Sequence, residues 1–274
     1  MHSLFALAAF ASLAMHASAN CSYGTSLHRR DAHGPVHVAS YSYSGTTGPI
    51  NWAGLNPEYH DCALGHNQSP IDFNRSIAFA TEKPLLNIPP TFGAEIENLG
   101  STVEVFLSGT LTYVGKTYNL VQYHFHTPGE HRINNEHYPL EMHMVHQADD
   151  GSFVVVGILF QLSEKGKTTE FVRQTIINLS AIREPGTRSS TGYLNFGVLA
   201  LALQTQPIYQ YSGSLTTPPC KEGITFLILA NPFPMDVTSY NSLKAVMKFN
   251  SRYTQNNLNQ DNLLQISAEQ LSAF

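Results

Sequence analysis

The chain has 274 residues, of which 42% are hydrophobic and 11% aromatic, enough to bury a sizeable core in one large domain or two small ones. Charged residues make up only 13% of the chain and the formal net charge is -5, which excludes the basic surface that a nucleic-acid backbone requires. We therefore predict a globular protein that does not bind nucleic acid.

The first 19 residues have the pattern of a secretory signal peptide. An apolar stretch from Leu4 to Met15 precedes Ala17-Ser18-Ala19, a small-x-small cleavage pattern, although no Lys or Arg stands before the stretch. The alternative is a buried N-terminal helix. No later segment has the roughly 18 apolar residues of a membrane span, and the stretch after Gln255 is too polar for an anchor signal. These features predict a secreted, extracellular protein without a membrane anchor.

Residues 20–40 are polar, bear histidines and lack periodicity, so we predict a flexible leader before a domain that covers 41–274. The chain has three cysteines, and an exported protein with an odd number has one left over. Cys21 lies ahead of the dibasic pair Arg29-Arg30, where a protease could remove it with the leader. Alternatively, Cys21 links two subunits, so a homodimer stays open.

Short apolar segments rich in Val, Ile, Tyr and Phe predict β-strands along the domain. They are VEVFL (103–107), YNLVQYHFH (118–126), LEMHMVH (140–146), FVVVGILFQL (153–162) and ITFLILA (224–230). Helical patterning is confined to 168–180 and to 239–249, the latter with Thr238 or Ser239 as N-cap. Pro and Gly punctuate the chain without any repeat or low-complexity linker. We predict one sheet-dominated α+β domain with peripheral helices.

Histidines recur on one face of two of these predicted strands. Side chains alternate along a strand, so Leu120, Gln122, His124 and His126 share a face, with Tyr123 and Phe125 on the other. Two imidazoles side by side can share a tetrahedral zinc ion, although an H-x-H pair alone is a weak signal.

The segment at 140–146 strengthens this interpretation, because Glu141, His143 and Val145 share a face and a loop of about a dozen residues permits antiparallel pairing with the first strand. Three neutral imidazoles leave zinc one open position for water, which is the arrangement of a catalytic rather than a structural site. The alternative is a set of hydrogen-bonded core histidines, which would place polar groups repeatedly inside buried strands.

Four segments resemble the secreted, eukaryotic-type members of the alpha-class carbonic anhydrases, in the family's order and with similar separations over nearly the whole domain. They are YSGTTGPINW (43–52), QSPID (68–72), QYHFHTPGEH with LEMHMVH (122–131 and 140–146), and YSGSLTTPPC (211–220). The resemblance implies a central, twisted, mostly antiparallel sheet of about ten strands with short peripheral helices. It also implies reversible hydration of carbon dioxide to bicarbonate and a proton, by attack of zinc-bound hydroxide.

The resemblance assigns a role to each matched residue of the site. His124, His126 and His143 correspond to the zinc ligands, and Gln122 and Glu141 to the acceptors that anchor His124 and His143. Thr216 corresponds to a threonine whose hydroxyl donates to Glu130 and therefore must accept from the attacking hydroxide. Without the resemblance, Gln122 and Glu141 are ordinary strand polars, Thr216 belongs to a turn and Glu130 is a surface carboxylate. The substrate pocket is implied for Val145, Val155, Leu215, Thr217 and Phe226.

Two positions depart from the family pattern. Phe226 stands where the family usually has tryptophan, which keeps the pocket apolar and alters its shape. Ser101 stands where fast members have a histidine that passes protons to buffer, and serine cannot do this near neutral pH. The substitution implies slower turnover that proton transfer limits.

The resemblance also implies covalent features. Cys62 and Cys220 fall where extracellular members form a disulfide, with buried free thiols as the alternative. Sequons occur at Asn67, Asn74 and Asn178, and because the first lies in a matched motif before proline, we favour Asn74 and Asn178 as glycan sites.

Two other functions compete with carbon dioxide hydration. One is a zinc esterase that uses the same hydroxide, and the other is a non-catalytic extracellular binding module, since some relatives have lost zinc ligands. The presence of all three histidines, Glu130 and Thr216 favours the enzyme.

Overall fold

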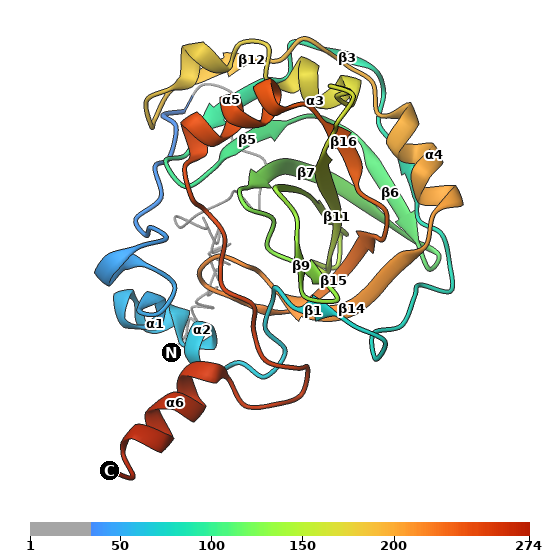
Figure 1. Cartoon of the computed structure of the whole chain (residues 1–274). Helices are drawn as coiled ribbons and strands as arrows, with labels where there is room; N and C mark the ends of the chain where they lie inside the picture. Colours follow the sequence, from blue (N-terminus) through green and yellow to red (C-terminus); the bar gives the residue numbers. More distant parts are fainter. Residues whose placement is uncertain (1–33) are drawn as a thin grey trace, which may run out of the picture.

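Alternating β-branched and aromatic side chains build a large mixed sheet that dominates a computed structural model, which describes residues 34–274. The sheet has eleven strands, eight of which follow one another in the order β12-β4-β5-β7-β10-β11-β15-β14. Of the other three, β6 pairs with β7, β2 pairs with β6, and β16 pairs with β11. Its pairs are antiparallel except β11 with β15 and with β16. The predicted fold class is therefore confirmed (Figure 1).

The strands, in chain order, are β1 (Asp72–Phe73), β2 (Leu85–Asn87), β3 (Thr91–Phe92), β4 (Glu95–Asn98), β5 (Val103–Phe106), β6 (Thr110–Tyr113), β7 (Lys116–His126), β8 (Arg132–Ile133), β9 (Glu136–His137), β10 (Leu140–Gln147), β11 (Phe153–Leu162), β12 (Arg188–Ser190), β13 (Tyr193–Leu194), β14 (Ile208–Ser214), β15 (Glu222–Leu229) and β16 (Phe233–Met235). Strands β1, β8 and β9 form a small second sheet, and β13 pairs with β3. All five segments that the sequence predicted as strands belong to the large sheet.

The α-helices are α1 (Trp52–Leu55), α2 (Asp61–Leu64), α3 (Glu170–Thr175), α4 (Gly197–Thr205), α5 (Val237–Met247) and α6 (Leu263–Leu271), with 3₁₀ turns η1 (Gly45–Thr47), η2 (Pro57–Tyr59) and η3 (Leu179–Ile182). They surround the sheet, and α6 projects from the body near the C-terminus (Figure 1). In the part of the chain that the structure describes, none of these helices has the length and apolarity of a membrane span.

The helix predictions need three corrections. The N-cap of α5 is Asp236, whose carboxylate accepts from the Ser239 amide at 2.8 Å, rather than Thr238 or Ser239. Helix α4 was not predicted, because Val198 and Leu201 are exposed apolar residues on its outer side and remove the amphipathic contrast. Helix α6 was also missed.

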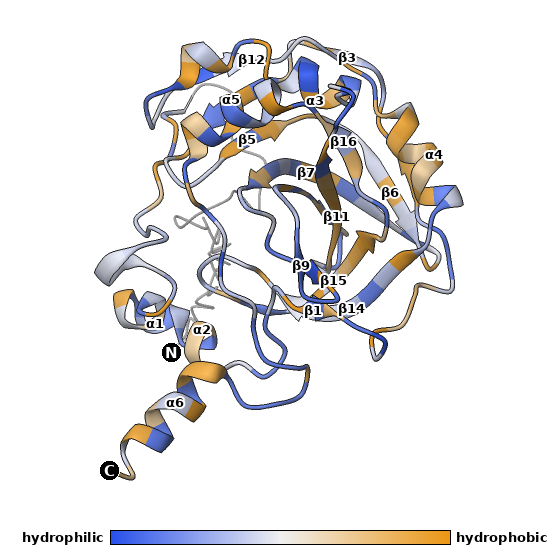
Figure 2. Cartoon of the chain, viewed as in Figure 1, coloured by the Kyte–Doolittle hydropathy of each residue, from blue (hydrophilic) through white to orange (hydrophobic). Residues whose placement is uncertain are grey.

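The two faces of the sheet have different partners. Tyr123, Phe125, Met142 and Met144 pack into the largest apolar core, opposite the face that carries the histidines. Leu120, predicted on the histidine face, instead joins this core. The cause is a register shift in the β7–β10 pairing opposite Val145 and His146, which reverses the alternation beyond that point. Figure 2 shows the consequence: most of β11 and β15 is hydrophobic, whereas β7 mixes both kinds of residue.

The predicted signal peptide, Cys21 and the Arg29-Arg30 pair lie outside the described residues. The described end of the predicted leader, residues 34–40, has no helix or strand. It is joined to the domain by a hydrogen bond from Ala39 N–H to Leu99 O at 3.0 Å and by one from Arg188 to Gly34 O.

Candidate metal centre

Three buried histidines meet on adjacent strands at the centre of the sheet. His124 and His126 lie on β7, and His143 on β10 is the register partner of His124. At most 4% of each residue is exposed. Each histidine can offer one ring nitrogen as a metal ligand, and these three nitrogens lie within 4.8 Å of one another. The strand pairing that the sequence suggested thus brings the predicted ligands together.

Hydrogen bonds fix the tautomer of each ring. His124 Nδ1 donates to Gln122 Oε1 at 2.8 Å, and His126 Nδ1 donates to the carbonyl of Asn250 at 2.9 Å. His143 uses its other nitrogen, Nε2, to donate to Glu141 Oε1 at 2.7 Å. Because a neutral imidazole has one N–H, the lone pairs remain on Nε2 of His124 and His126 and on Nδ1 of His143.

The chemistry of these donors fits a zinc ion. Burial, followed by the neighbouring imidazoles of His126 and His143, holds the pKa of His124 well below its usual range. Burial lowers the pKa of His126 to about 4. Both rings are therefore neutral at neutral pH, the form that binds metals. His126 Nε2 is buried without a hydrogen-bond partner among residues 34–274, as expected of an atom reserved for a ligand. Three nitrogen donors with an open fourth position are typical of catalytic zinc.

Glu141 is the acceptor at the centre of a hydrogen-bond network beneath the histidines. Its Oε1 accepts from His143 and from His131 Nδ1 at 2.6 Å, and its Oε2 accepts from the backbone amides of Glu130 and His131, both at 2.8 Å. Burial alone would raise the pKa of Glu141, but the facing imidazoles and their hydrogen bonds hold it well below its usual range. The carboxylate is ionised and fixes the orientation of His143.

We expect Glu141→Gln to lower zinc affinity by about 10- to 100-fold, because the amide cannot accept from all four donors and releases His143. Competition with a chromophoric chelator measures the affinity. Glu95→Gln is the matched control, since Glu95 lies on β4 and pairs with Arg188. Equal zinc affinity in Glu141→Gln and wild type would contradict an anchoring role.

Glu130 lies beside the centre, fully buried. Its Oε1 accepts from the Arg252 amide at 2.9 Å and is 3.4 Å from His126 Nδ1, and its Oε2 is 4.0 Å from His143 Nδ1. Burial raises the pKa of Glu130 to about 7, against opposing effects of His143, the Arg252 amide and the Thr216 hydroxyl. Thr216, in the loop after β14, is thus close enough to influence this carboxylate.

The predicted pocket residues gather in one apolar cluster next to the histidines. Val145 pairs with Val155 across β10 and β11, and Val155 pairs with Phe226 on β15. Leu215 belongs to the same buried cluster, and the ring of Phe226 lies 5.7 Å from that of His143. Thr217 is buried in the loop after Leu215.

Ser101 is buried in the turn between β4 and β5, and its Oγ has no hydrogen-bond partner within the described part of the chain. It lies near the hydroxyl of Tyr41. Burial raises the pKa of Tyr41 far above its ordinary value, and interactions with Ser101, Thr217 and Tyr43 oppose the rise. Neither hydroxyl titrates near neutral pH.

The sequence did not reveal several residues that support the site. His131 donates to Glu141 and accepts from Tyr211 Oη at 2.6 Å, and Tyr211 is 2.7 Å from Ser69 Oγ. His131 follows Glu130 directly in a matched motif, which was a usable signal. Asn250 anchors His126 through its backbone carbonyl, and no sequence pattern marks such a contact.

The covalent predictions have different outcomes. Cys62 and Cys220 form a disulfide, with Cα atoms 5.1 Å apart. Asn74 and Asn178 are exposed. Asn74 Oδ1 accepts from Ser76 Oγ, the hydroxyl of its own sequon, at 2.6 Å, whereas Asn178 Nδ2 donates to Ser190 O at 2.8 Å.

Comparisons with known proteins agree with this geometry. The model of the eukaryotic-type carbonic anhydrase family matches residues 47–267. A carbonic anhydrase of Pectobacterium atrosepticum is 32% identical over 76% of this chain and 83% of its own. Alpha carbonic anhydrase 4 of Arabidopsis thaliana is 32% identical over 69% of this chain and 70% of its own. The fungal alpha carbonic anhydrase structure from Aspergillus oryzae has a TM-score of 0.82 and 43% identity, covering 84% of this chain and 98% of that one.

Proposed function

The chain belongs to the eukaryotic-type, alpha-class carbonic anhydrases, and we propose that it catalyses the reversible hydration of carbon dioxide to bicarbonate and a proton at the centre formed by His124, His126 and His143. The observation that carries the proposal is the convergence of three imidazole nitrogens beside an apolar cluster. A non-catalytic relative would not need to preserve this donor set.

Zinc held by these residues supplies hydroxide at neutral pH, because it lowers the pKa of a bound water to about 7. The chain's part is to hold the donors rigid. Gln122, Asn250 and Glu141 each accept the remaining N–H of one histidine, which fixes the rings and raises the basicity of their free nitrogens.

Thr216 and Glu130 orient the attacking oxygen in this proposal. The Thr216 hydroxyl has one proton, and donating it in a hydrogen bond to the Glu130 carboxyl group leaves its oxygen as an acceptor only. The hydroxyl oxygen would therefore accept a hydrogen bond from the attacking hydroxide and so direct a lone pair of that hydroxide at the substrate carbon. The Thr216 backbone N–H can donate to the negative charge that develops on the substrate oxygens.

Carbon dioxide lacks a strong polar group, so its binding relies on apolar contact. Val145, Val155, Leu215 and Phe226 supply that surface, and no more than 8% of any of them is exposed. Such a wall holds the substrate weakly and does not compete with Thr216 for bicarbonate, which suits rapid release of the product.

Stopped-flow measurement of carbon dioxide hydration on metal-analysed protein tests the proposal. We expect activity that scales with bound zinc, disappears on chelation and returns when zinc is restored. Ester hydrolysis measured on the same samples should have a far lower kcat/KM. Stoichiometric zinc without hydration activity would overturn the proposal.

The residue at position 101 sets a further expectation. Because Ser101 and Tyr41 cannot exchange protons with bulk buffer near neutral pH, we expect kcat to rise with the concentration of imidazole-type buffers. Ser101→His should raise kcat at low buffer by about tenfold and remove most of this dependence. Ser101→Ala should behave like wild type. A buffer-independent wild-type rate would contradict the expectation.

We also propose that the protein is secreted and carries a glycan at Asn74. The Cys62–Cys220 disulfide supports an oxidising compartment.

Asn74 is exposed and its side-chain amide nitrogen forms no hydrogen bond among the described residues, whereas that of Asn178 is bonded to Ser190 O. Mass spectrometry of the secreted protein before and after deglycosylation should show loss of a glycan that Asn74→Gln abolishes. An unmodified Asn74 would contradict the proposal.

A further inference from the structure

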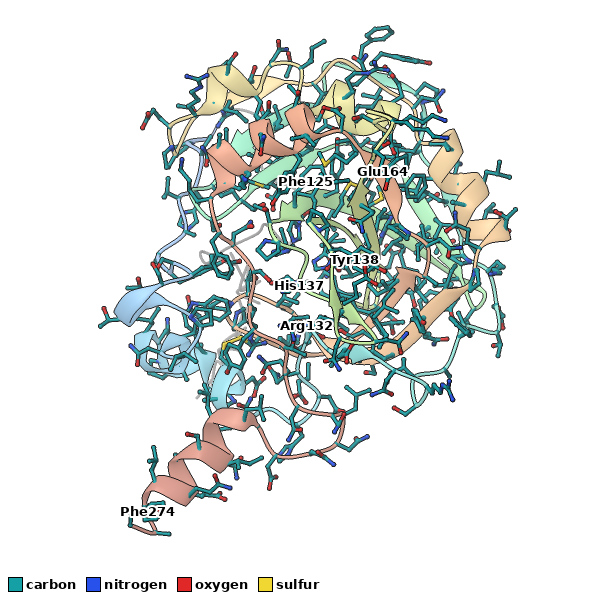
Figure 3. All side chains as sticks on the ribbon, in the orientation of Figure 1. Phe125, Arg132, His137, Tyr138, Glu164 and Phe274 are labelled. Carbon is teal, nitrogen blue, oxygen red and sulfur yellow. A yellow bond between two sulfur atoms is a disulfide. The ribbon has the colours of Figure 1, made fainter. Side chains whose placement is uncertain are left out.

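A pocket of about 370 Å³, whose lining includes none of the three histidines, lies between the β8–β9 hairpin and two segments from opposite ends of the domain. The hairpin contributes Arg132 and His137, which are register partners. Figure 3 shows these two residues close together near the middle of the molecule. Residues 43–50 and the segment 249–254, which follows α5, supply the other walls.

The pocket carries positive charge with unused donors. Arg132 Nε is buried and has no hydrogen-bond partner among residues 34–274, and Arg132 takes part in none of the ion pairs of that range. Arg252, 1% exposed, also lines the pocket, and its Nε lacks a partner in the same range. A buried guanidinium N–H without an acceptor is costly, so an anion that accepted from it would be stabilised.

The opposing groups leave a net positive charge. Glu130 is the carboxylate in the lining, and its Oε1 already accepts from the Arg252 amide. Burial, followed by the charge of Arg132, lowers the pKa of His137, so this ring is neutral at neutral pH and adds no charge. Two guanidinium groups against one carboxyl group, whose pKa burial raises to about 7, leave at least one positive charge for a ligand to neutralise.

Part of the remaining wall is apolar and exposed to solvent, beside the hydroxyl-bearing residues Ser251 and Thr254. Ile50 is 68% exposed and Phe249 is 59% exposed, and both line the pocket together with Pro49. Exposed aliphatic and aromatic side chains around a charged group are typical of small-molecule sites, which combine apolar walls with a few polar anchors. The volume admits a ligand the size of one substituted ring.

We propose that this pocket binds a small organic monocarboxylate with an apolar body, whose carboxylate pairs with Arg132 and whose body lies against Ile50 and Phe249. The site is separate from the three-histidine centre, and the proposal does not depend on carbon dioxide hydration. Glu130 is the one side chain that both sites share.

Isothermal titration with benzoate tests the proposal, with benzamide as the uncharged probe of the same shape. We expect benzoate to bind zinc-loaded and zinc-free protein alike, and benzamide to bind at least tenfold more weakly. Arg132→Gln should weaken benzoate binding by about tenfold or more, the loss of one charge-assisted contact. Phe249→Ala should weaken benzoate and benzamide by a similar factor, because it removes only apolar contact.

Arg183→Gln is the matched control, since Arg183 is exposed on another part of the surface, and it should bind benzoate like wild type. Thermal unfolding of each variant verifies that it is folded. No benzoate binding by wild type, equal affinity in Arg132→Gln, or binding that disappears when zinc is removed would each overturn the proposal. These binding results do not bear on the rate of carbon dioxide hydration, which tests the three-histidine centre.

Discussion

Replacing His143 by alanine is expected to leave the purified protein without stoichiometric zinc and to lower kcat/KM for carbon dioxide hydration by at least about 10³-fold. His143 is the one ligand that β10 contributes, so its loss leaves only the two imidazoles of β7. Two neutral nitrogens hold zinc weakly, and without the ion a water molecule keeps its ordinary pKa, far above neutral, and supplies little hydroxide at neutral pH. Metal analysis and stopped-flow kinetics on the same sample measure both consequences.

His146 provides a matched control on the same strand. It is buried like His143, but its Nδ1 interacts with Met144 O at 3.1 Å. In the described range, two groups of residues could hold a metal, and both contain His143 whereas neither contains His146. We expect His146→Ala to lower stability through the cavity it leaves, and to retain stoichiometric zinc and activity when folded. Loss of zinc in both variants alike would indicate a general folding defect and would contradict the assignment of His143 as a ligand.

The sequence was sufficient for the strands that carry this centre. Alternation on β7 and β10 separates Tyr123 and Phe125 from the histidines, because residues two apart must face the same way in any regular strand. The position of Leu120 could not be predicted in this way. A register shift in the β7–β10 pairing reverses the alternation there, and no residue in the stretch marks it.

The groups that anchor the three histidines were harder to predict than the histidines themselves. Glu141 and Gln122 lie two residues from the histidines they anchor, so strand geometry places them. The third anchor is a backbone carbonyl of Asn250, 124 residues from His126. Such a contact depends on how the segment after α5 returns to the sheet, and a backbone acceptor has no side chain to signal its role.

Removing the disulfide by the double substitution Cys62→Ala and Cys220→Ala is expected to lower the free energy of unfolding by up to about 5 kcal/mol. The two residues are 158 positions apart. A loop of that length confines the unfolded chain strongly, and the loop-entropy relation then gives about 5 kcal/mol at 25 °C. Urea denaturation measures the change, and Cys21→Ala is the matched control because it removes a thiol and keeps the bridge. A loss below about 1 kcal/mol would contradict the entropic estimate.

The same double variant should separate stability from catalysis. Cys220 N–H donates to Thr217 O at 2.9 Å in the loop that carries Thr216, and Cys62 O accepts from Arg252, whose amide holds Glu130. The bridge therefore fixes both partners of the Thr216–Glu130 pair, whereas the three histidines are placed by strand pairing and by their hydrogen bonds to Gln122, Asn250 and Glu141. We expect the folded variant to keep stoichiometric zinc and to lose kcat. If kcat is unchanged, the loop is held by its hydrogen bonds and the bridge acts on stability only.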